Sequence, residues 1–342
     1  MDEVDFYCGK SILVTGGVGS IGKELVKKIL KMDVGSVRVL DNNETGLFDL
    51  GQELQSDKIR LLVGDVRDKE RLKRAMEGID VVFHAAALKH VPLCEYNPFD
   101  AVKTNILGTQ NVLNVALDEE VEKVIVISTD KAANPVNVMG ATKLLAERLT
   151  LSANFYRGKR KTVFSCVRFG NVMASRGSVI PLFMEQIKGG GPVTVTDPEM
   201  TRFIMDIPKA TGLILEAGKI AQHGEIFILK MPVLKIGDLA DVMIAFCTQK
   251  YGQSVNDVRI KVTGARPGEK KYEELMTESE AEHAYENEHM FIVLPLHVKE
   301  KMQSSILPDG FYKSQKKRYS SSEEAIINKR GIFDLLRNLY PF

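Results

Sequence analysis

The chain has 342 residues, 27% of them charged, and a net charge of +1. This length allows one large α/β domain and a smaller one, and the balanced charge excludes a strongly basic nucleic-acid-binding surface. No apolar run reaches the roughly 18 residues of a membrane-spanning helix, and the first ten residues lack a signal-peptide pattern. We therefore expect a cytoplasmic protein with no membrane or nucleic-acid partner. The four cysteines are scattered without zinc spacing, which predicts free thiols and no metal site.

A glycine-rich turn follows the first predicted strand, residues 11–15, and precedes a helical pattern over residues 23–32. Glycines let such a turn approach a pyrophosphate, and the free N–H groups at the helix start face its charge. This turn gives the first candidates for cofactor binding, which are Gly16, Gly19, Ser20, Ile21 and Gly22.

Acidic residues end the next two predicted strands. Asp41 lies nineteen residues after Gly22, near the spacing of about 20 at which an acid meets the adenosine ribose. Its charge repels a 2′-phosphate and favours NAD, although Asn42 and Asn43 soften that preference, so NADP stays open. Asp65 is a candidate for the adenine amino group or an ordinary turn residue.

The fourth predicted strand, residues 81–84, opens into small residues. Ala85 and Ala86 allow a flat ring system to come close. Lys89, in the next loop, is a candidate for a phosphate or sugar hydroxyl, or a solvated lysine. A helix is predicted over residues 98–117. Further candidates for cofactor binding are Val66 and Asn105.

The stretch 124–147 is the centre of the predicted site. It begins as a β-branched strand, typical of a strand buried on both faces of a parallel sheet, and then reaches Thr129, Asp130 and Lys131. An acid beside an amine at the carboxyl end of such a strand indicates proton transfer. Turn and capping chemistry is the alternative interpretation. Lys143 lies four residues after Met139, on the same face of the following helix.

Alternation of strands and helices up to a strand at 162–169 predicts an α/β fold, a Rossmann-type doubly wound parallel sheet with a smaller C-terminal substrate-binding domain. We place the dinucleotide-binding domain at 1–170, with a return segment near 203–235. The substrate-binding region, or lid, is placed at 171–202 and 236–342. Ser320, Ser321 and Ser322 are interpreted as a break before one or two closing helices.

The region after residue 170 carries candidates for substrate binding. Arg176, Arg202 and Arg266 have guanidinium forks that match diphosphate oxygens, although single arginines often form surface ion pairs. Arg266 begins a Gly-Pro turn that presents its charges. Further candidates for substrate contact are Lys89, Asn171, Val179, Thr194 and Glu269.

Five motifs in order resemble the UDP-N-acetylglucosamine 4,6-dehydratases of polysaccharide biosynthesis, within the extended short-chain dehydrogenase/reductase superfamily. The resemblance covers about residues 10–275. The motifs are AAALKHVPLCEYNPFDAVKTNILGT, STDKAANPVNVMGATK, RFGNVMASRGSVIPLF, DPEMTRF and RPGEK.

The resemblance implies a reaction and roles for particular residues. Such enzymes oxidise C4 of the sugar with NAD or NADP, remove the C5 proton, expel the C6 hydroxyl as water and return the hydride to C6. The cofactor is therefore tightly bound and recycled. The resemblance implies that Lys131 is the C5 base, Asp130 the acid for the C6 oxygen, Thr129 a sugar contact and Lys143 the ligand of the nicotinamide ribose. Lys131 must be partly neutral, and we expect burial and Lys143 to lower its pKa.

Met139 departs from the superfamily pattern, which has a tyrosine there, because a thioether cannot titrate. It resembles a branch of the same dehydratases. The implied product is a UDP-4-keto-6-deoxy-hexosamine with C5 retained or inverted, or a released 5,6-ene. A 4-epimerase and a non-catalytic dinucleotide-binding protein are the alternatives. The resemblance also implies a homo-oligomer built on the helix pair that includes the segment after Lys143.

Overall fold

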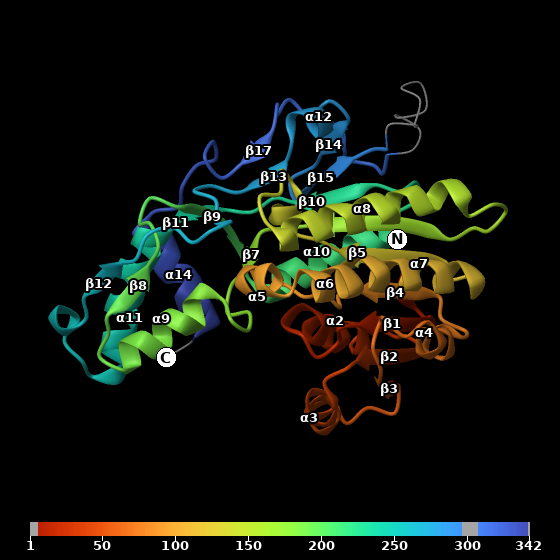
Figure 1. Cartoon of the computed structure of the whole chain (residues 1–342), viewed down its shortest axis with the longest axis horizontal. Coiled ribbons are helices and arrows are strands. Elements are labelled where there is room, and N and C mark those ends of the chain that lie inside the picture. The colour runs from red at the N-terminus through yellow and green to blue at the C-terminus, as the bar shows by residue number, and fades with distance from the viewer. Residues whose placement is uncertain (1–5, 296–306, 341–342) are drawn as a thin grey trace.

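The structure is a computed structural model that describes residues 6–295 and 307–340. Seven neighbouring parallel strands form most of its largest sheet: β3 (Ile59–Val63), β2 (Ser36–Asp41), β1 (Ser11–Thr15), β4 (Val81–His84), β5 (Lys123–Ile127), β6 (Val163–Arg168) and β10 (Ile226–Leu229). Antiparallel strands continue it: β15 (Met290–Val293), β14 (Ala284–Glu286) and β16 (Tyr312–Lys313). The order β16-β14-β15-β10-β6-β5-β4-β1-β2-β3 contains the Rossmann order 3-2-1-4-5-6, which confirms the predicted fold class (Figure 1).

Strand β5 shows why these segments pair in the middle of the sheet. Its residues KVIVI are all buried, as expected for β-branched side chains covered on both faces. The register is in step across the centre, with Ile125 opposite Phe83 on one side and Ser165 on the other. The carboxyl ends of these strands therefore meet at one edge, where the candidate residues follow.

Helices pack on this sheet in two groups (Figure 1). In one group α2 contacts α10, and in the other α7 lies between α4 and α8. The bounds are α2 (Ser20–Leu30), α3 (Glu44–Leu54), α4 (Lys69–Met76), α5 (Val91–Tyr96), α6 (Pro98–Ala101), the π-helix η1 (Val102–Gly108), α7 (Thr109–Asp118), the 3₁₀ turn η2 (Asp130–Ala132), α8 (Val138–Tyr156) and α10 (Ile207–Ile220). Residues 98–117 are thus helical as predicted, but with a π segment in the middle.

A second lobe lies to one side of the sheet (Figure 1). It contains α9 (Val179–Lys188), β8 (Val193–Val195), α11 (Ile236–Tyr251), the 3₁₀ turn η3 (Val255–Asp257), β12 (Ile260–Val262) and α14 (Lys329–Leu339). Its buried apolar residues form a cluster separate from the core of the main sheet. A three-stranded sheet in the order β11-β9-β7 lies nearby, made of β7 (Asn171–Val172), β9 (Thr201–Met205) and β11 (Val233–Lys235).

The chain after residue 270 contributes to both parts. Strand β13 (Glu274–Met276) pairs with β17 (Tyr319–Ser320), and α12 (Glu278–Ala281) follows β13. Because β14, β15 and β16 join the main sheet, residues 236–342 do not all lie in the second lobe. Ser320 and Ser321, expected to form a break, are buried in and beside a strand. The predicted assignment of one lobe to dinucleotide and the other to substrate stays a prediction.

Candidate active site

The glycine-rich loop between β1 and α2 is shaped by close backbone contacts. Gly16 has a φ of +68°, and a Cβ built there would lie 2.5 Å from the Ala86 nitrogen. A Cβ at Gly22 would lie 2.3 Å from the Gly16 oxygen, so neither position admits a side chain. Helix α2 starts after Gly19 without a side-chain cap, which leaves its first N–H groups for an anion. The loop fits the pyrophosphate of a dinucleotide.

Asp41 is fixed at the end of β2 beside this loop. Its carboxylate accepts from the backbone N–H groups of Val18 (3.1 Å) and Asn43 (3.0 Å). The Asn43 side chain caps α3 by accepting from Gly46, and Asn42 donates to Asp65 at 3.4 Å. Asn43 is therefore committed to the fold, whereas Asp41 lies where a ribose-binding acid is expected.

Asp65 is paired within the protein. Arg67 donates to both carboxylate oxygens at 2.9 and 2.7 Å, and these hydrogen bonds hold the pKa of Asp65 below its usual value despite burial. The neighbouring Val66 is buried, and its carbonyl accepts from Asn111. A contact of Asp65 with adenine stays a prediction, since the strand-end position is as expected but the carboxylate already has an arginine.

Asn105 and Lys143 hold backbone at the edges of β4 and β5. The Asn105 amide accepts from the N–H of Leu88 (2.8 Å) and donates to its carbonyl (3.0 Å), so it fixes the loop after Ala85 and Ala86. Lys143 is buried and donates to the carbonyl of Ile127 at 2.6 Å. Burial lowers the pKa of Lys143, against the charge of Glu147.

Asp130 and Lys131 lie at the carboxyl end of β5, where the 3₁₀ turn begins. The Asp130 carboxylate is fully buried, and its Oδ1 accepts from Lys131 Nζ at 2.9 Å and from the Thr129 hydroxyl at 2.8 Å. Its Oδ2 is buried with no hydrogen-bond partner among the described residues. The acid and the amine are therefore in contact, and one carboxylate oxygen is left for another group.

Glu273 is the site residue that sequence reasoning missed. It is 3% exposed, and its Oε1 lies 3.4 Å from Lys131 Nζ. Burial raises the pKa of Glu273, while Lys131 acts in the opposite sense. Burial also acts to lower the pKa of Lys131, but the charges of Asp130 and Glu273 outweigh it and raise that pKa. We had expected a lowered value with Lys143 as a cause, and the structure shows two carboxylates instead.

Met139 lies in an apolar cluster. It is 4% exposed and packs with Cys94 and Ala101, against the partly buried Val91 and Val138. This apolar cluster joins α5 to the start of α8. A buried thioether in apolar surroundings cannot titrate, so Met139 offers no group for proton transfer.

The segment around Arg176 covers the glycine-rich loop. Its backbone N–H donates to the Ser20 hydroxyl at 3.0 Å, and its guanidinium donates to the Val18 carbonyl at 3.3 Å. Lys89 donates to the Arg176 carbonyl at 2.8 Å, and burial lowers the pKa of Lys89. These contacts line a cavity of about 700 Å³ next to α2. Arg176 therefore lies beside the dinucleotide loop.

The other predicted substrate residues are spread over three places. One small cavity, between β7, α9 and β9, is lined by Asn171, Val179 and Arg202. Thr194 lies apart, in β8, where its side chain accepts from Gln186. Arg266 is exposed on its turn.

Arg202 is committed to protein groups. Its guanidinium donates to the carbonyls of Thr201, Lys270 and Lys271 and lies 3.6 Å from Glu269. In the described part of the chain, the Arg202 guanidinium therefore has no free pair of N–H groups for a diphosphate. Its side chain instead connects the 270–273 segment to β9. Its role in substrate binding stays a prediction.

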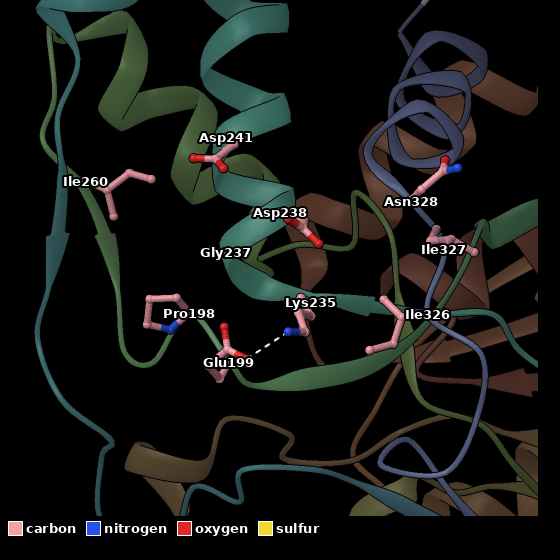
Figure 2. Close-up of a pocket in the computed structure, with 10 residues that line it drawn as sticks. All are labelled: Pro198, Glu199, Lys235, Gly237, Asp238, Asp241, Ile260, Ile326, Ile327 and Asn328. Atoms are coloured by element: carbon pink, nitrogen blue, oxygen red, sulfur yellow. Dashed lines mark hydrogen bonds and ion pairs between the residues drawn. The ribbon is translucent and has the colours of Figure 1, made fainter.

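A cavity of about 480 Å³ in the second lobe contains none of the predicted residues (Figure 2). It lies between the start of α11 and the segment before α14. Lys235 and Glu199 form an ion pair of 2.8 Å at one side, and Asp238 points toward the same space (Figure 2). The residues that line this cavity do not include Asp130, Lys131 or Glu273.

Residues 12–295 match a family model described as polysaccharide biosynthesis protein. An uncharacterized membrane protein of Methanocaldococcus jannaschii is 60% identical over 99% of this chain and 98% of its own. The capsular polysaccharide biosynthesis protein CapD of Staphylococcus aureus is 49% identical over 79% of this chain, which spans 46% of CapD. A UDP-glucose 4-epimerase of Rickettsia rickettsii is 42% identical over 80% of each chain.

The X-ray structure of Pen from Bacillus thuringiensis superimposes with a TM-score of 0.91 at 45% identity, covering 98% of this chain and all of Pen. Together with the glycine-rich loop and the Rossmann sheet, these similarities place the chain in the extended short-chain dehydrogenase/reductase class of enzymes. More narrowly, the chain belongs to the polysaccharide biosynthesis protein family. Among its described helices none is long and apolar enough to cross a membrane.

Proposed function

We propose that this protein is a nucleotide-sugar dehydratase that removes water across C5 and C6 of UDP-N-acetylglucosamine for surface-glycan or related sugar biosynthesis. The observation that carries the proposal is the buried Asp130 carboxylate in contact with the Lys131 amine at the catalytic edge of the sheet. An acid and a base in one place suit an elimination, in which a proton is removed and an oxygen leaves.

The residues present fit NAD or NADP as a retained cofactor. The glycine-rich loop would hold the pyrophosphate, Asp41 the adenosine ribose and Lys143 the nicotinamide ribose. A bound NAD or NADP would supply the hydride acceptor for C4 and the hydride donor for C6. Asp41 favours NAD by charge, and the exposed Asn42 leaves NADP open.

Asp130 would supply the proton for the leaving oxygen. Its Oδ1 already accepts from Lys131 and Thr129, so Oδ2 is the atom left to carry a proton toward a substrate. Only the neutral carboxylic acid can donate, so Asp130 has to carry a proton at this step.

Lys131 would take the C5 proton. Its raised pKa favours the ammonium form, which cannot act as a base. Moving one proton from Lys131 Nζ to Asp130 nevertheless converts the ion pair into a neutral amine and a neutral acid, which is the active pair. The total number of protons on the two side chains does not change. Elimination then restores the ion pair.

The likeness to UDP-glucose 4-epimerases favours epimerisation as the second candidate. An epimerase needs no acid at C6, so the buried Asp130 has no evident use in it. Incubation of the purified protein with UDP-N-acetylglucosamine, followed by mass spectrometry, separates the two. Loss of one water supports dehydration, an unchanged mass with a new C4 configuration supports epimerisation, and no change supports a dinucleotide-binding protein. NMR of the product in heavy water then gives the C5 configuration.

We predict that Lys131→Ala abolishes water loss, lowering the rate at least about 100-fold, because a positioned base contributes about 10²- to 10⁴-fold. Bound dinucleotide should be retained, since the ion pairs of Lys131 are with Asp130 and Glu273, outside the glycine-rich loop. Lys159→Ala, at an exposed lysine after α8, is the control and should keep full activity. Unimpaired turnover of Lys131→Ala refutes its assignment as the base.

A further inference from the structure

Glu273 is far from Asp130 and Lys131 in the sequence but lies beside them in the fold. Its Oε1 lies 3.4 Å from Lys131 Nζ, which is also 2.9 Å from Asp130 Oδ1. The Lys131 amine is therefore held between two buried carboxylates. Two further cations face the Glu273 carboxylate: Arg202, whose Nε is 4.0 Å away, and Lys270.

The backbone of Glu273 is fixed by the paired strands β13 and β17. Its N–H donates to the Ser321 hydroxyl at 2.9 Å, and the Ser321 N–H donates to its carbonyl at 2.9 Å. The Ser321 hydroxyl also pairs with that of Thr201 at 2.8 Å. The position of this carboxylate is thus set by the fold and does not depend on the Lys131 contact alone.

Glu273 and Asp130 each keep one buried oxygen without a hydrogen-bond partner among the described residues, Oε2 and Oδ2 respectively. Buried carboxylate oxygens in a stable fold are normally satisfied, and exceptions gather at functional sites. Two such oxygens beside one amine indicate a unit that exchanges protons. A purely structural ion pair would leave none.

We propose that Glu273 is a positioning residue of the dehydratase site, which holds the Lys131 amine against Asp130 and strengthens it as the base for the C5 proton. This inference rests on the proposed function. When the C5–H bond breaks, its proton goes to Nζ and its electron pair forms the C5–C6 double bond. The C6–O bond breaks, and the Asp130 proton completes the water. Glu273 stabilises the ammonium formed in that step.

The pH dependence of water loss by Glu273→Gln tests the proposal. The active pair holds one proton fewer than the fully protonated pair, so the acidic limb of the kcat profile reports the loss of that proton. Removing the negative charge of Glu273 lets the pair lose it at lower pH, so the limb should move down by about one to three units. The plateau kcat should fall, because a weaker base removes the C5 proton more slowly. KM should stay within about twofold, since Glu273 acts through Lys131.

Matched variants separate charge from folding. Glu274→Gln alters the next residue, whose side chain contacts Asn134, and should leave the limb in place. Glu273→Asp keeps the charge and should return the limb toward the wild-type position. It also serves as the test if the Gln variant does not fold: the shorter side chain should move the limb part of the way.

The failure of this inference differs from failure of the proposed function. If the wild-type protein releases no water from UDP-N-acetylglucosamine, the dehydratase proposal fails. If the wild type releases water and the acidic limb stays fixed in both Glu273 variants, the role of Glu273 is overturned while the dehydratase proposal stands.

Discussion

Met139 stands where the resemblance to short-chain dehydrogenases predicts a tyrosine, and its surroundings show what a tyrosine would have to fit. The side chain fills a closed cluster with Cys94 and Ala101. A flexible thioether suits such an irregular space, whereas a phenol is larger and needs a hydrogen-bond partner when buried. The surroundings of this position therefore suit methionine, and a tyrosine placed here would not simply supply a catalytic base.

We predict that Met139→Tyr lowers the free energy of unfolding by about 1–3 kcal/mol, the usual cost of overpacking a core, and gives no gain in dehydration. Met139→Leu conserves volume and should cost less than about 1.5 kcal/mol. Denaturant titration measures both changes. A Met139→Tyr protein that is as stable as the wild type and turns over faster would contradict this account.

Single residues also show where sequence reasoning reached its limit. Asp130 and Lys131 were recognisable because ionisable residues directly follow a buried strand. Glu273 was not, since it reaches the pair only through the fold of β13 against β17. The predicted direction of the Lys131 pKa shift was also wrong, because the charges of Asp130 and, next, Glu273 outweigh burial.

Among the elements, β6, α8 and α12 are joined by one buried arginine. Arg168 is fully buried and pairs with Glu147 at 2.6 Å and with Glu280 at 2.9 Å. It also donates to the Leu275 carbonyl at 2.8 Å. The guanidinium therefore connects the Rossmann sheet to the segment that carries Glu273.

We predict that Arg168→Met lowers the free energy of unfolding by about 3–5 kcal/mol, because two carboxylates lose their buried cation. Arg318→Met, which removes an exposed pair with Glu323, should cost far less, because solvent screens exposed ion pairs. Denaturant titration at neutral pH measures both. Equal effects of the two substitutions would contradict a special role for the buried ion group.

The pH dependence of the free energy of unfolding provides a second test of the ion group around Arg168. Burial acts to raise the pKa of Glu280, but Arg168 outweighs it, so the folded pKa is lowered. Its contribution is present above the ordinary pKa of about 4.3 and is lost as the pH falls through the folded value. In Arg168→Met this acid-dependent loss should shrink.

Elements with strong apolar patterns were predictable, and short polar ones were not. The strands up to β6 appeared near their observed bounds because β-branched runs mark buried parallel strands. Helices α3 and α4 were missed: α4, KERLKRAM, buries only Leu72, Ala75 and Met76. Helix α5 was not predicted, since its six residues are too few for a helical period.

At the scale of the whole molecule, the surface over α5, α6 and η1 carries unusually exposed apolar side chains. Tyr96 is 88% exposed, Phe99 80%, and Leu93 and Leu107 are also exposed. These elements lie beside α8, the helix that follows the catalytic turn (Figure 1). Large apolar patches mark contact surfaces, so this face supports the predicted homo-oligomer.

We predict that Phe99→Asp, combined with Tyr96→Glu, dissociates the protein into a smaller species. Charges placed in an apolar interface must be desolvated when subunits associate, which weakens binding. Light scattering after size-exclusion chromatography measures the mass. Phe48→Asp, at an aromatic residue of α3 that is 60% exposed, is the control and should leave the mass unchanged. An identical mass for all three proteins argues against this face as the interface.

The pairing of β13 with β17 has a consequence for protein synthesis. The ribosome completes the glycine-rich loop and the Asp130 turn long before it adds Ser321, the residue that supports the backbone of Glu273. A nascent chain can therefore fold its Rossmann sheet and bind dinucleotide while its proton-transfer unit still lacks that support. Full turnover then begins only after residues 319–321 leave the exit tunnel and add their strand.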